Sequence, residues 1–481
     1  MTAATTSTLA LPDTGRTFLA GRWSRDHREV VEVRAPAGDV LLATVPRQGP
    51  VEVDAAVHAA LASRDAWAAT DPGARAAALD TLADALAGEV DDLAALISAD
   101  VGTPAKVARA VQVELPITVL RTTAARLRTM TFTERRGPSE VTHAGVGVVG
   151  AITPWNYPLH QSVAKIAGAW AAGCPVVHKP SELAPLAVLR LGELIAEVVV
   201  DLELPAGVYS QLSGVGHEVG ALLAGHPDLD HLSFTGSAAV GAQVAAAAAT
   251  QLTAVTLELG GKSPAVVLPG GNLEAAVRAT VNSCLLNSGQ TCNALTRLLV
   301  HRSVYEEAAR LAGERAASLE SRLGPLISAA HRDRVNATLE RALDEGARLV
   351  VGGPDAPTDR GAGFWARATV LTDLAPDAGI VRDEVFGPVL CVQAYDDEEE
   401  ALRLASAAPY GLAAAIWARD GDEAVRFARR LRVGQVSVNG APFDPEAPFG
   451  GFGASGFGRE LGEAGIRNFL TTTSVQLPST A

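Results

Sequence analysis

From residue 145 onward, the chain alternates between short apolar segments typical of buried strands and longer segments with the spacing of amphipathic helices. The expected strands of this series lie at 145–153, 175–180, 208–214 and 231–236. Helices are expected around 160–172, at 185–200, at 216–225 and from 237. Strands that alternate with helices indicate a parallel, doubly wound sheet, because each crossover between parallel strands needs a helix. The pattern therefore predicts the α/β fold class.

A second series of strand-like segments begins near AVTLELGG at 254–261. Its further members lie at 264–268, 296–302, 347–353, 389–395 and 434–440. A length of 481 residues favours two to three domains, at about 150 residues each. We therefore expect two doubly wound α/β domains. Residues 50–115 read as helices, whereas 123–142 fit neither series and have β character with a Gly-Pro turn.

Composition and charge exclude several classes of function. The formal net charge of −14 argues against a nucleic-acid partner, whose phosphates would be repelled. No apolar stretch reaches the roughly 20 residues that span a bilayer, and the alanine-rich run at 244–250 is expected to be a buried helix. Residues 1–15 lack the basic and apolar regions of a secretory signal. The four cysteines show no Cys-x-x-Cys spacing, so reduced thiols and a cytoplasmic location are expected. No metal site is expected, since the ten histidines include no His-x-x-x-His pair.

Two segments contain glycines in spacings known from phosphate-binding loops. Gly145, Gly147 and Gly150 match the G-x-G-x-x-G fingerprint, but they lie inside a strand-like run and open no helix, as that fingerprint requires. We interpret them as glycines that allow close packing. Residues 234–241, FTGSAAVG, follow a strand and lead into a helix that Ser237 can cap, so backbone amides there can approach an anion. A capped helix without a ligand is the competing interpretation.

Three segments place a reactive side chain among glycines and prolines. They are TPWNYP with Asn156, LELGGKSP with Glu258 and NSGQTCN with Cys292. Taken singly, such an asparagine is most often a turn former, such a glutamate a surface charge and such a cysteine a buried filler. Their occurrence together with the segment 234–241 favours a functional site instead.

Eight motifs lie in order along the chain. They are PWNYP at 154–158, KPSE at 179–182, FTGSAAVG at 234–241, LELGGKSP at 257–264, SGQTCNA at 288–294, EVFGP at 384–388, YGLAA at 410–414 and PFGGFGASGFGRELG at 448–462. With these motifs the chain resembles the NAD(P)-dependent aldehyde dehydrogenase superfamily over nearly its whole length. Any one motif alone would be weak evidence, but their number and order are specific.

The resemblance implies a Rossmann-like NAD-binding domain, a catalytic domain and a small β oligomerisation arm. The expected bounds are 1–122 with 143–257 for the NAD-binding domain, 258–453 for the catalytic domain, and 123–142 with 454–481 for the oligomerisation and bridging segment. In the family the arm pairs with a C-terminal strand, here near FLTTTSVQL, and extends a neighbour's sheet. A homodimer or homotetramer is therefore expected.

The resemblance also implies that an aldehyde substrate is oxidised to a carboxylic acid. Cys292 would be the nucleophile that forms a thiohemiacetal and then a thioester. The side-chain amide of Asn156 and the backbone N–H of Cys292 would hold the oxyanion, and Glu258 would activate the hydrolytic water. Lys165 and Glu460 match positions that can pass the proton onward.

Three alternatives to this activity remain open at this point. CoA-acylating relatives typically lack the glutamate, so Glu258 favours hydrolysis over acyl transfer in a CoA-acylating semialdehyde dehydrogenase. A non-catalytic protein that retains the fold would have lost Asn156, Glu258 or Cys292, and all three are present. A thiol hydrolase with a Cys/His pair leaves the segment 234–241 unexplained.

NAD is the implied cofactor, and NADP is disfavoured. A carboxylate at Glu182, beside Lys179, accepts hydrogen bonds from ribose hydroxyls but repels a 2′-phosphate. Glu384 and Phe386 match the residues that hold the nicotinamide ribose and ring. The full set of positions that the resemblance assigns to the cofactor is Ile152, Trp155, Lys179, Ser181, Glu182, Gly216, Phe234, Thr235, Gly236, Ser237, Val240, Leu259, Glu384 and Phe386.

The chain departs from the family at several positions. The connection at 317–324 is shortened, which leaves open how His331 meets the nicotinamide ribose. Gly453 stands where a lysine is usual, and Ser406 where an asparagine is usual.

The residues expected near the substrate differ as well. His160, Gln161 and Ala164 stand where relatives often carry bulky apolar side chains, and Phe443 is a candidate wall from the other domain. These residues predict a wide, partly polar substrate entrance, whereas the competing interpretation places His160 and Gln161 on a helix surface.

Overall fold

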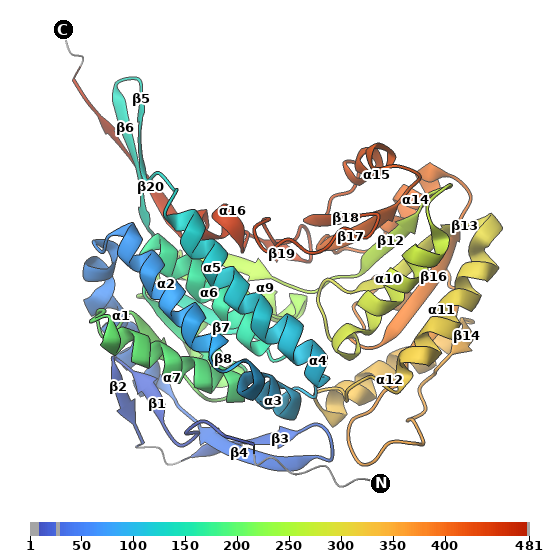
Figure 1. The fold of residues 1–481 in the computed structure, drawn as a ribbon, viewed down its shortest axis with the longest axis horizontal. Coiled ribbons are helices and arrows are strands. Elements are labelled where there is room, and N and C mark those ends of the chain that lie inside the picture. Colours follow the sequence, from blue (N-terminus) through green and yellow to red (C-terminus); the bar gives the residue numbers. More distant parts are fainter. Residues whose placement is uncertain (1–8, 26–28, 479–481) are drawn as a thin grey trace.

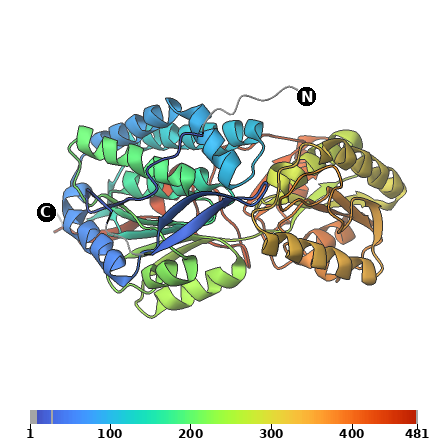
Figure 2. The same ribbon diagram turned by 90° about the horizontal axis from the view of Figure 1, so that it is seen from below.

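The computed structural model describes residues 9–25 and 29–478 of the chain. Residues 1–8, 26–28 and 479–481 lie outside the described part, and they include much of the stretch compared above with a secretory signal. Two large sheets, each covered by helices, stand side by side, and a narrow three-stranded arm projects from one of the two bodies (Figures 1 and 2).

The first sheet has six strands in the order β19-β11-β10-β7-β8-β9. Its parallel strands are β7 (Val149–Thr153), β8 (Val176–Pro180), β9 (Tyr209–Gln211), β10 (His231–Thr235) and β11 (Ala254–Glu258). The short β19 (Gly456–Phe457) is antiparallel to β11 at one edge. The crossover helices are α6 (Pro158–Ala172), α7 (Leu186–Asp201), α8 (Ala221–Ala224) and α9 (Ala238–Ala249). Every residue of β7, β8 and β10 is buried, as expected for parallel strands with helices on both faces.

The helices predicted for 50–115 pack on this sheet and its crossover helices. They are α1 (Pro50–Ala68), α2 (Pro72–Ala87), α3 (Val90–Asp100), α4 (Ala105–Val107) and α5 (Glu114–Leu127). A π-helical turn, η1 (Ala108–Val113), joins α4 to α5, and a second one, η2 (Gly216–Gly220), precedes α8. Trp67 of α1 contacts Trp170 of α6 edge to face, with ring centroids 5.7 Å apart. Because both rings are fully buried, this pair anchors the N-terminal helices to the core of the sheet.

The second sheet has seven strands in the order β14-β15-β16-β13-β12-β17-β18. Its parallel strands are β12 (Ser263–Val267), β13 (Leu295–His301), β15 (Thr369–Thr372), β16 (Val389–Tyr395), β17 (Ala413–Trp417) and β18 (Gln435–Val438), and β14 (Arg348–Val351) is antiparallel at one edge. The helices of this body are α10 (Leu273–Leu285), α11 (Tyr305–Glu320), α12 (Ala329–Asp344), α13 (Gly379–Arg382), α14 (Glu398–Ala405) and α15 (Gly421–Ala428). Two helix-flanked parallel sheets confirm the predicted fold class.

A third sheet forms the arm, in the order β20-β6-β5. Its strands are β5 (Thr133–Arg136), β6 (Ser139–Gly145) and β20 (Leu470–Gln476), and the short helix α16 (Gly462–Arg467) precedes β20. β20 runs antiparallel to β6, from Leu470 opposite Gly145 to Gln476 opposite Ser139. The pairing of the segment near 133–145 with the C-terminal strand is therefore present. β20 is an outer strand of this sheet, and its side chains after Leu470 are exposed.

Two antiparallel hairpins precede α1. They are β1 (Thr17–Leu19) with β2 (Arg22–Ser24), and β3 (Val30–Ala35) with β4 (Val40–Pro46). Neither hairpin is predicted by the sequence pattern, because only a few residues of these strands are buried and β1 and β2 have three residues each.

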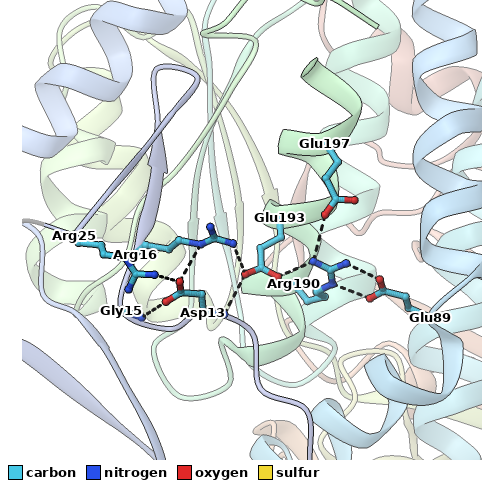
Figure 3. A network of polar contacts seen from close by, with 8 residues as sticks. All are labelled: Asp13, Gly15, Arg16, Arg25, Glu89, Arg190, Glu193 and Glu197. Carbon is cyan, nitrogen blue, oxygen red and sulfur yellow. Dashed lines mark hydrogen bonds and ion pairs between the residues drawn. The ribbon is translucent and has the colours of Figure 1, made fainter. Parts of the chain in front are cut away.

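A chain of ion pairs holds the N-terminal segment against α7 (Figure 3). Glu193 accepts hydrogen bonds from the Arg190 guanidinium at 2.7 Å, from the Arg16 guanidinium at 2.9 Å and from the backbone N–H of Asp13 at 3.1 Å. Arg190 in turn binds both carboxylate oxygens of Glu89. Since Glu193 is only 7% exposed, its charge depends on these donors, so the network fixes the segment that leads into β1.

The structure differs from the sequence-based expectations in four further places. Residues 123–127, expected to have β character, are the last turn of α5. The segment 254–261 does not begin the second series, because β11 lies beside β10 in the first sheet. The run 244–250 lies largely in α9, but that helix covers the sheet with one face only, so most of its alanines are not buried. The strands β15 and β17 are additional to the predicted series.

The glycines that resemble a dinucleotide fingerprint join β6 to β7 and open no helix. Gly147 has a φ of +126°, and a Cβ there would lie 2.0 Å from the carboxylate of Asp230. That carboxylate accepts a hydrogen bond from the backbone N–H of Val148 at 2.7 Å. A Cβ at Gly150 would lie 2.8 Å from Leu229. The interpretation of these glycines as close-packing residues is confirmed.

Candidate active site

A cavity of about 460 Å³ opens between the two bodies. The first body contributes the segments that follow β7, β10 and β11, three strands that are neighbours in the sheet. Neighbouring parallel strands end at the same edge, which is where ligands bind in open α/β sheets. The lining residues are Pro154, Trp155, Asn156, Gln161, Thr235, Gly236, Ser237, Ala238, Ala239, Leu259, Gly260, Cys292, Arg334, Glu384, Phe386 and Tyr410.

Cys292 reaches this cavity from a tight loop between α10 and β13. Asn287, Ser288 and Gly289 all have left-handed backbone conformations, with φ of +50°, +57° and +77°. Successive positive φ values reverse the direction of the chain within one turn. Such backbone conformations are strained, and they persist only where the surrounding structure holds them in place. The side chain of Cys292 is half-buried at the cavity wall. Burial, with the nearby carboxylates of Glu384 and Glu258, raises the pKa of the thiol to about 12.

Asn156 follows β7 and is 4% exposed. Its side-chain amide donates a hydrogen bond to the backbone carbonyl of Gln290 at 3.0 Å, in the loop that carries the cysteine. Among the described residues, neither the second amide N–H of Asn156 nor the backbone N–H of Cys292 has an oxygen acceptor. Two donors of this kind on one cavity wall can stabilise a negative oxygen.

Glu258 is the last residue of β11 and is 2% exposed. Neither of its carboxylate oxygens has a hydrogen-bond partner among the described residues. Burial raises the pKa of this carboxyl well above its ordinary value, the charge of Glu460 raises it further, and Lys165 and Arg459 oppose the shift. A buried carboxyl of this kind exchanges protons closer to neutral pH than an exposed glutamate does.

Lys165 and Glu460 form a buried ion pair behind Glu258. The Lys165 ammonium donates to Glu460 at 2.5 Å and to the hydroxyl of Ser233 at 3.0 Å. Lys165 is fully buried and Glu460 is 3% exposed. The structure therefore brings the five residues expected to be catalytic into one region: Cys292 and Asn156 line the cavity, and Glu258 is close enough to interact electrostatically with Cys292 and with the Lys165–Glu460 pair.

The turn from β10 into α9 brings several of the expected cofactor residues to the cavity. Thr235, Gly236 and Ser237 line it, and the hydroxyl of Ser237 caps α9 by accepting from the N–H of Val240 at 3.3 Å. Leu259 also lines the cavity and packs against Gly241 of α9, where a Cβ would lie 2.5 Å from it. Ile152 and Phe234 are buried in the strands beneath, whereas the side chain of Val240 is 44% exposed.

Lys179, Glu182 and Gly216 form a second group at the end of β8, outside the lining of the cavity. The Lys179 ammonium donates to Glu182 at 2.9 Å, and the backbone N–H of Gly216 donates to the same carboxylate at 3.2 Å. Burial opposes ionisation of Glu182, but the Lys179 charge and these hydrogen bonds outweigh it and hold the pKa of Glu182 below its ordinary value. Ser181 accepts a local hydrogen bond from the N–H of Leu183 at 3.3 Å. Glu182 is thus an ionised hydrogen-bond acceptor just after the C-terminal end of β8 in the first sheet.

Glu384 and Phe386 line the cavity from the second body. Glu384 accepts a hydrogen bond from the N–H of Gly261 at 3.0 Å, and burial raises its pKa to about 7. The ring of Phe386 meets Trp155 edge to face with centroids 5.6 Å apart. The cavity therefore has an acidic corner beside an aromatic wall.

His331 contacts Phe386, with ring centroids 6.0 Å apart. The N–H at Nε2 donates to the carbonyl of Phe386 at 2.7 Å, while Nδ1 accepts from Arg334 at 2.7 Å. Burial, together with the Arg334 charge, lowers the pKa of His331 to about 4, so the ring is neutral. Arg334 and Tyr410 line the cavity but are absent from the sequence-based list. The spacing of Arg334 after His331 on one helix face is the signal that could have identified it.

Of the expected substrate-side residues, Gln161 and Phe443 line two different hollows. Gln161 is 7% exposed, lines the cavity and accepts from the Thr235 hydroxyl at 3.3 Å, so a helix-surface position is wrong for it. His160 is half-buried, its Nδ1 has no partner among the described residues, and burial lowers its pKa to about 4. Phe443 is 40% exposed and lines a second hollow of about 530 Å³ together with Asn293, the residue after Cys292.

Gly453 and Ser406, which depart from the family pattern, lie beside a third hollow away from Cys292. Gly453 has a φ of +62°, and a Cβ there would lie 2.7 Å from the carbonyl of Pro409. Between residues 9 and 478, apart from 26–28, no cluster of three potential metal ligands is found. The same part of the chain contains no helix long and apolar enough to cross a bilayer.

Comparison with known proteins agrees with this arrangement. Residues 23–475 match the family model described as Aldehyde dehydrogenase family. A 3-succinoylsemialdehyde-pyridine dehydrogenase of Pseudomonas sp is 37% identical over 474 residues, covering 95% of this chain and 97% of the relative. A chloroplastic betaine aldehyde dehydrogenase of Beta vulgaris is 37% identical, covering 95% of each chain.

A solved structure shows the same fold. Aldehyde dehydrogenase C of Pseudomonas syringae, a cysteine-to-alanine mutant in complex with NAD+ and octanal, superposes with a TM-score of 0.95 at 38% identity, covering 98% of each chain. The agreement extends over both sheets, since so little of either chain is left uncovered. The chain therefore belongs to the aldehyde dehydrogenase family, and is an enzyme that oxidises aldehydes.

Proposed function

We propose that the protein oxidises an aldehyde to the free carboxylic acid with NAD, through a thioester on Cys292. The observation that carries the proposal is the shared cavity, where Cys292 and Asn156 meet residues from both bodies. The carboxyl of Glu258 is buried and close enough to raise the pKa of the Cys292 thiol. The NAD+ and octanal in the related Pseudomonas syringae structure support the same pairing of cofactor and substrate class.

The residues around the cavity suit a dinucleotide. The N-terminus of α9 carries partial positive charge and would hold a pyrophosphate. Gly236 has no side chain, so the pyrophosphate could approach the backbone amides there. Glu182 and Lys179 would hold the adenosine ribose, and Glu384 with Phe386 the nicotinamide ribose and ring. When bound, the oxidised nicotinamide supplies the hydride acceptor.

Glu182 also governs the choice between NAD and NADP. Its pKa is held below the ordinary value, so it carries full negative charge at neutral pH and would repel a 2′-phosphate. Lys179, already paired with this carboxylate, would compensate only in part. We expect kcat/KM to be higher with NAD than with NADP, and the reverse order in steady-state assays would contradict this role.

Attack on the aldehyde requires the thiolate of Cys292. Burial and the carboxylates of Glu384 and Glu258 oppose its formation, so the thiol proton must leave the cavity before the attack. The sulfur then adds to the carbonyl carbon, and the second amide N–H of Asn156 and the N–H of Cys292 donate to the oxyanion. Loss of hydride from that carbon leaves a thioester on the sulfur.

Hydrolysis of the thioester releases the acid. Glu258 takes a proton from water as the water attacks the acyl carbon, and the sulfur leaves as thiolate. Lys165 and Glu460 lie behind Glu258 and would pass the proton away from the cavity. A CoA-dependent route needs no such base, so the buried carboxyl supports hydrolysis.

The function is tested by supplying aliphatic, aromatic and ω-carboxylated aldehydes with NAD, with and without CoA, and following NADH absorbance. Formation of NADH and free acid without CoA is expected. A strict requirement for CoA would overturn the hydrolytic assignment, and absence of turnover with every aldehyde class would overturn the activity.

The oligomeric state is part of the proposal. The outer strand β20 exposes backbone donors and acceptors along one side of the arm, and such an edge pairs readily with another chain. We propose a homodimer or homotetramer in which the arm extends a neighbour's sheet. Multi-angle light scattering of the full chain should give a multiple of the 49.6 kDa protomer mass, and a stable monomer would contradict the proposal.

Replacing Cys292 with alanine should abolish NADH formation and leave NAD binding measurable by titration calorimetry. The reason is that only the sulfur can form the covalent intermediates, whereas the groups proposed to bind the cofactor stay in place. Cys391→Ala is the matched control, because that thiol is buried in β16 away from the cavity and should keep turnover. Retained oxidation in the Cys292 variant would refute the nucleophile.

Replacing Glu258 with glutamine should slow hydrolysis by about 10²- to 10⁴-fold, the range for a lost general base. The acyl-enzyme should then accumulate and appear in intact-protein mass spectra after aldehyde and NAD are mixed. Glu463→Gln, on the exposed face of α16, is the matched control. A wild-type steady-state rate in the Glu258 variant would remove this residue as the base.

The acidic limb of the kcat–pH profile should follow the ionisation of Glu258, because only the ionised carboxylate accepts a proton from water. Glu460 contributes like charge that raises the pKa of Glu258. Replacing Glu460 with glutamine should therefore lower that pKa and move the acidic limb to lower pH. A limb that stays in place would show that Glu258 does not control it.

A further inference from the structure

A buried cluster of amide and hydroxyl groups surrounds Asn156 and the loop that carries Cys292. Its members, called here the amide network, are Thr103, Gln112, Asn156, Asn287 and Gln290. All five are 4% exposed or less. Thr103 lies in the connection between α3 and α4 and Gln112 in η1, both far in sequence from every motif considered above.

Two amides fix the backbone carbonyl of Asn156. Gln112 Nε2 donates to it at 3.2 Å, and Asn287 Nδ2 donates to it at 2.9 Å. The side chain of Asn156 is fixed in turn, because its Nδ2 donates to the Gln290 carbonyl at 3.0 Å. Asn287 Nδ2 reaches that same carbonyl at 3.4 Å. The main chain and the side chain of residue 156 are thus held by one connected set of bonds.

Thr103 sets the direction of these amides. Its hydroxyl donates to Asn287 Oδ1 at 2.7 Å and accepts from Gln112 Nε2 at 2.9 Å. With Oδ1 occupied as an acceptor, Asn287 must turn Nδ2 toward Asn156. Asn287 itself is held at a φ of +50°, a conformation that asparagine tolerates better than most residues do.

The backbone conformation and the surroundings of Gln112 are both energetically unfavourable, which is not expected of a residue with a purely structural role. It lies in the π-helical turn η1, and its Oε1 is buried without a partner among the described residues. Turns of this kind are uncommon and are frequently found at functional sites, and an unpaired buried acceptor is unfavourable. Both features are explained if the position is required to aim a donor at the Asn156 carbonyl.

We infer that Gln112 and Thr103 are positioning residues that aim the Asn156 amide at the reacting oxygen. The inference rests on the proposed function, in which that amide is an oxyanion donor. A donor must lie within a few tenths of an ångström of its productive position, so a loosened support lowers the rate without removing the donor. Neither side chain lines the cavity, so each acts only through Asn156 and Asn287.

The central experiment is a double-mutant cycle between Gln112 and Asn156. Gln112→Met keeps the length of the side chain and removes both hydrogen bonds. It should lower kcat about tenfold, the effect expected when a supporting partner of an active-site group is lost, and leave the KM for NAD unchanged. Asn156→Ala should lower kcat by about 10²- to 10³-fold. The double variant should match Asn156→Ala, because a residue that acts through Asn156 has nothing left to position.

A second readout separates positioning from damage to the loop. Alkylation of Cys292 by iodoacetamide forms no oxyanion, so its rate should be unchanged in Gln112→Met. Thr103→Val and Thr103→Ser form a matched pair. Serine keeps the hydroxyl, so Thr103→Ser should retain the wild-type kcat, whereas Thr103→Val removes the hydroxyl and should lower kcat. This pair keeps the inference testable if the Gln112 variant does not fold.

Different results overturn different claims. Full turnover in Asn156→Ala would refute the oxyanion role and with it the proposed function at this residue. A large loss in Asn156→Ala with normal kcat in both Gln112→Met and Thr103→Val would refute the positioning role alone. Additive losses in the double variant, or slowed alkylation in Gln112→Met, would show that Gln112 acts on the structure generally.

Discussion

The hydrogen bond from the Asn156 side chain to the Gln290 carbonyl joins the two bodies at the point where chemistry is proposed to occur. Asn156 follows a strand of the first sheet, and Gln290 lies two residues before the cysteine, in the loop that enters the second. This bond and the one from Asn287 Nδ2 to the Asn156 carbonyl together keep the donor and the sulfur at a fixed separation. The cavity, the oxyanion site and the access of Glu258 to the acyl group all depend on their staying together. Its burial matters, because hydrogen bonds shielded from water are stronger and less exchangeable.

Burial also sets the charges around the cavity. Glu258, Glu384 and Glu460 are carboxyls at or near its walls, with Lys165 as the buried cation among them. Desolvation raises the pKa of Glu258 well above its ordinary value and that of Glu384 to about 7, so Glu384 can change its charge near neutral pH. Apolar side chains would pack there at lower cost. We interpret the acidic lining as a functional feature for that reason, since proton transfer needs groups that ionise reversibly.

Much of this arrangement is predictable from the sequence, and the failures have physical causes. Alternating strands and helices predict both sheets, because period and length are local properties. β11 was placed in the wrong series because its neighbour is decided by the crossover through α9. Asn156, Glu258 and Cys292 are identified by local motifs, whereas Gln112 lies in an unremarkable helical stretch. Only the π-helical turn and the tertiary contact with Asn156 reveal it.

The contacts of Gly324 show how a connection shortened as the resemblance implies would be accommodated beside this site. A Cβ at Gly324 would lie 2.0 Å from the carbonyl of Gly102, and the Gly324 carbonyl accepts from the Ser288 hydroxyl at 2.8 Å. The chain is therefore fixed at Gly324 between the N-terminal helices and the cysteine loop, whatever precedes it. Three residues later, the N–H of Ile327 donates to Gln290 Oε1 at 2.9 Å, inside the amide network. Length can change upstream of these contacts because the positions that hold Gln290 lie downstream of the change.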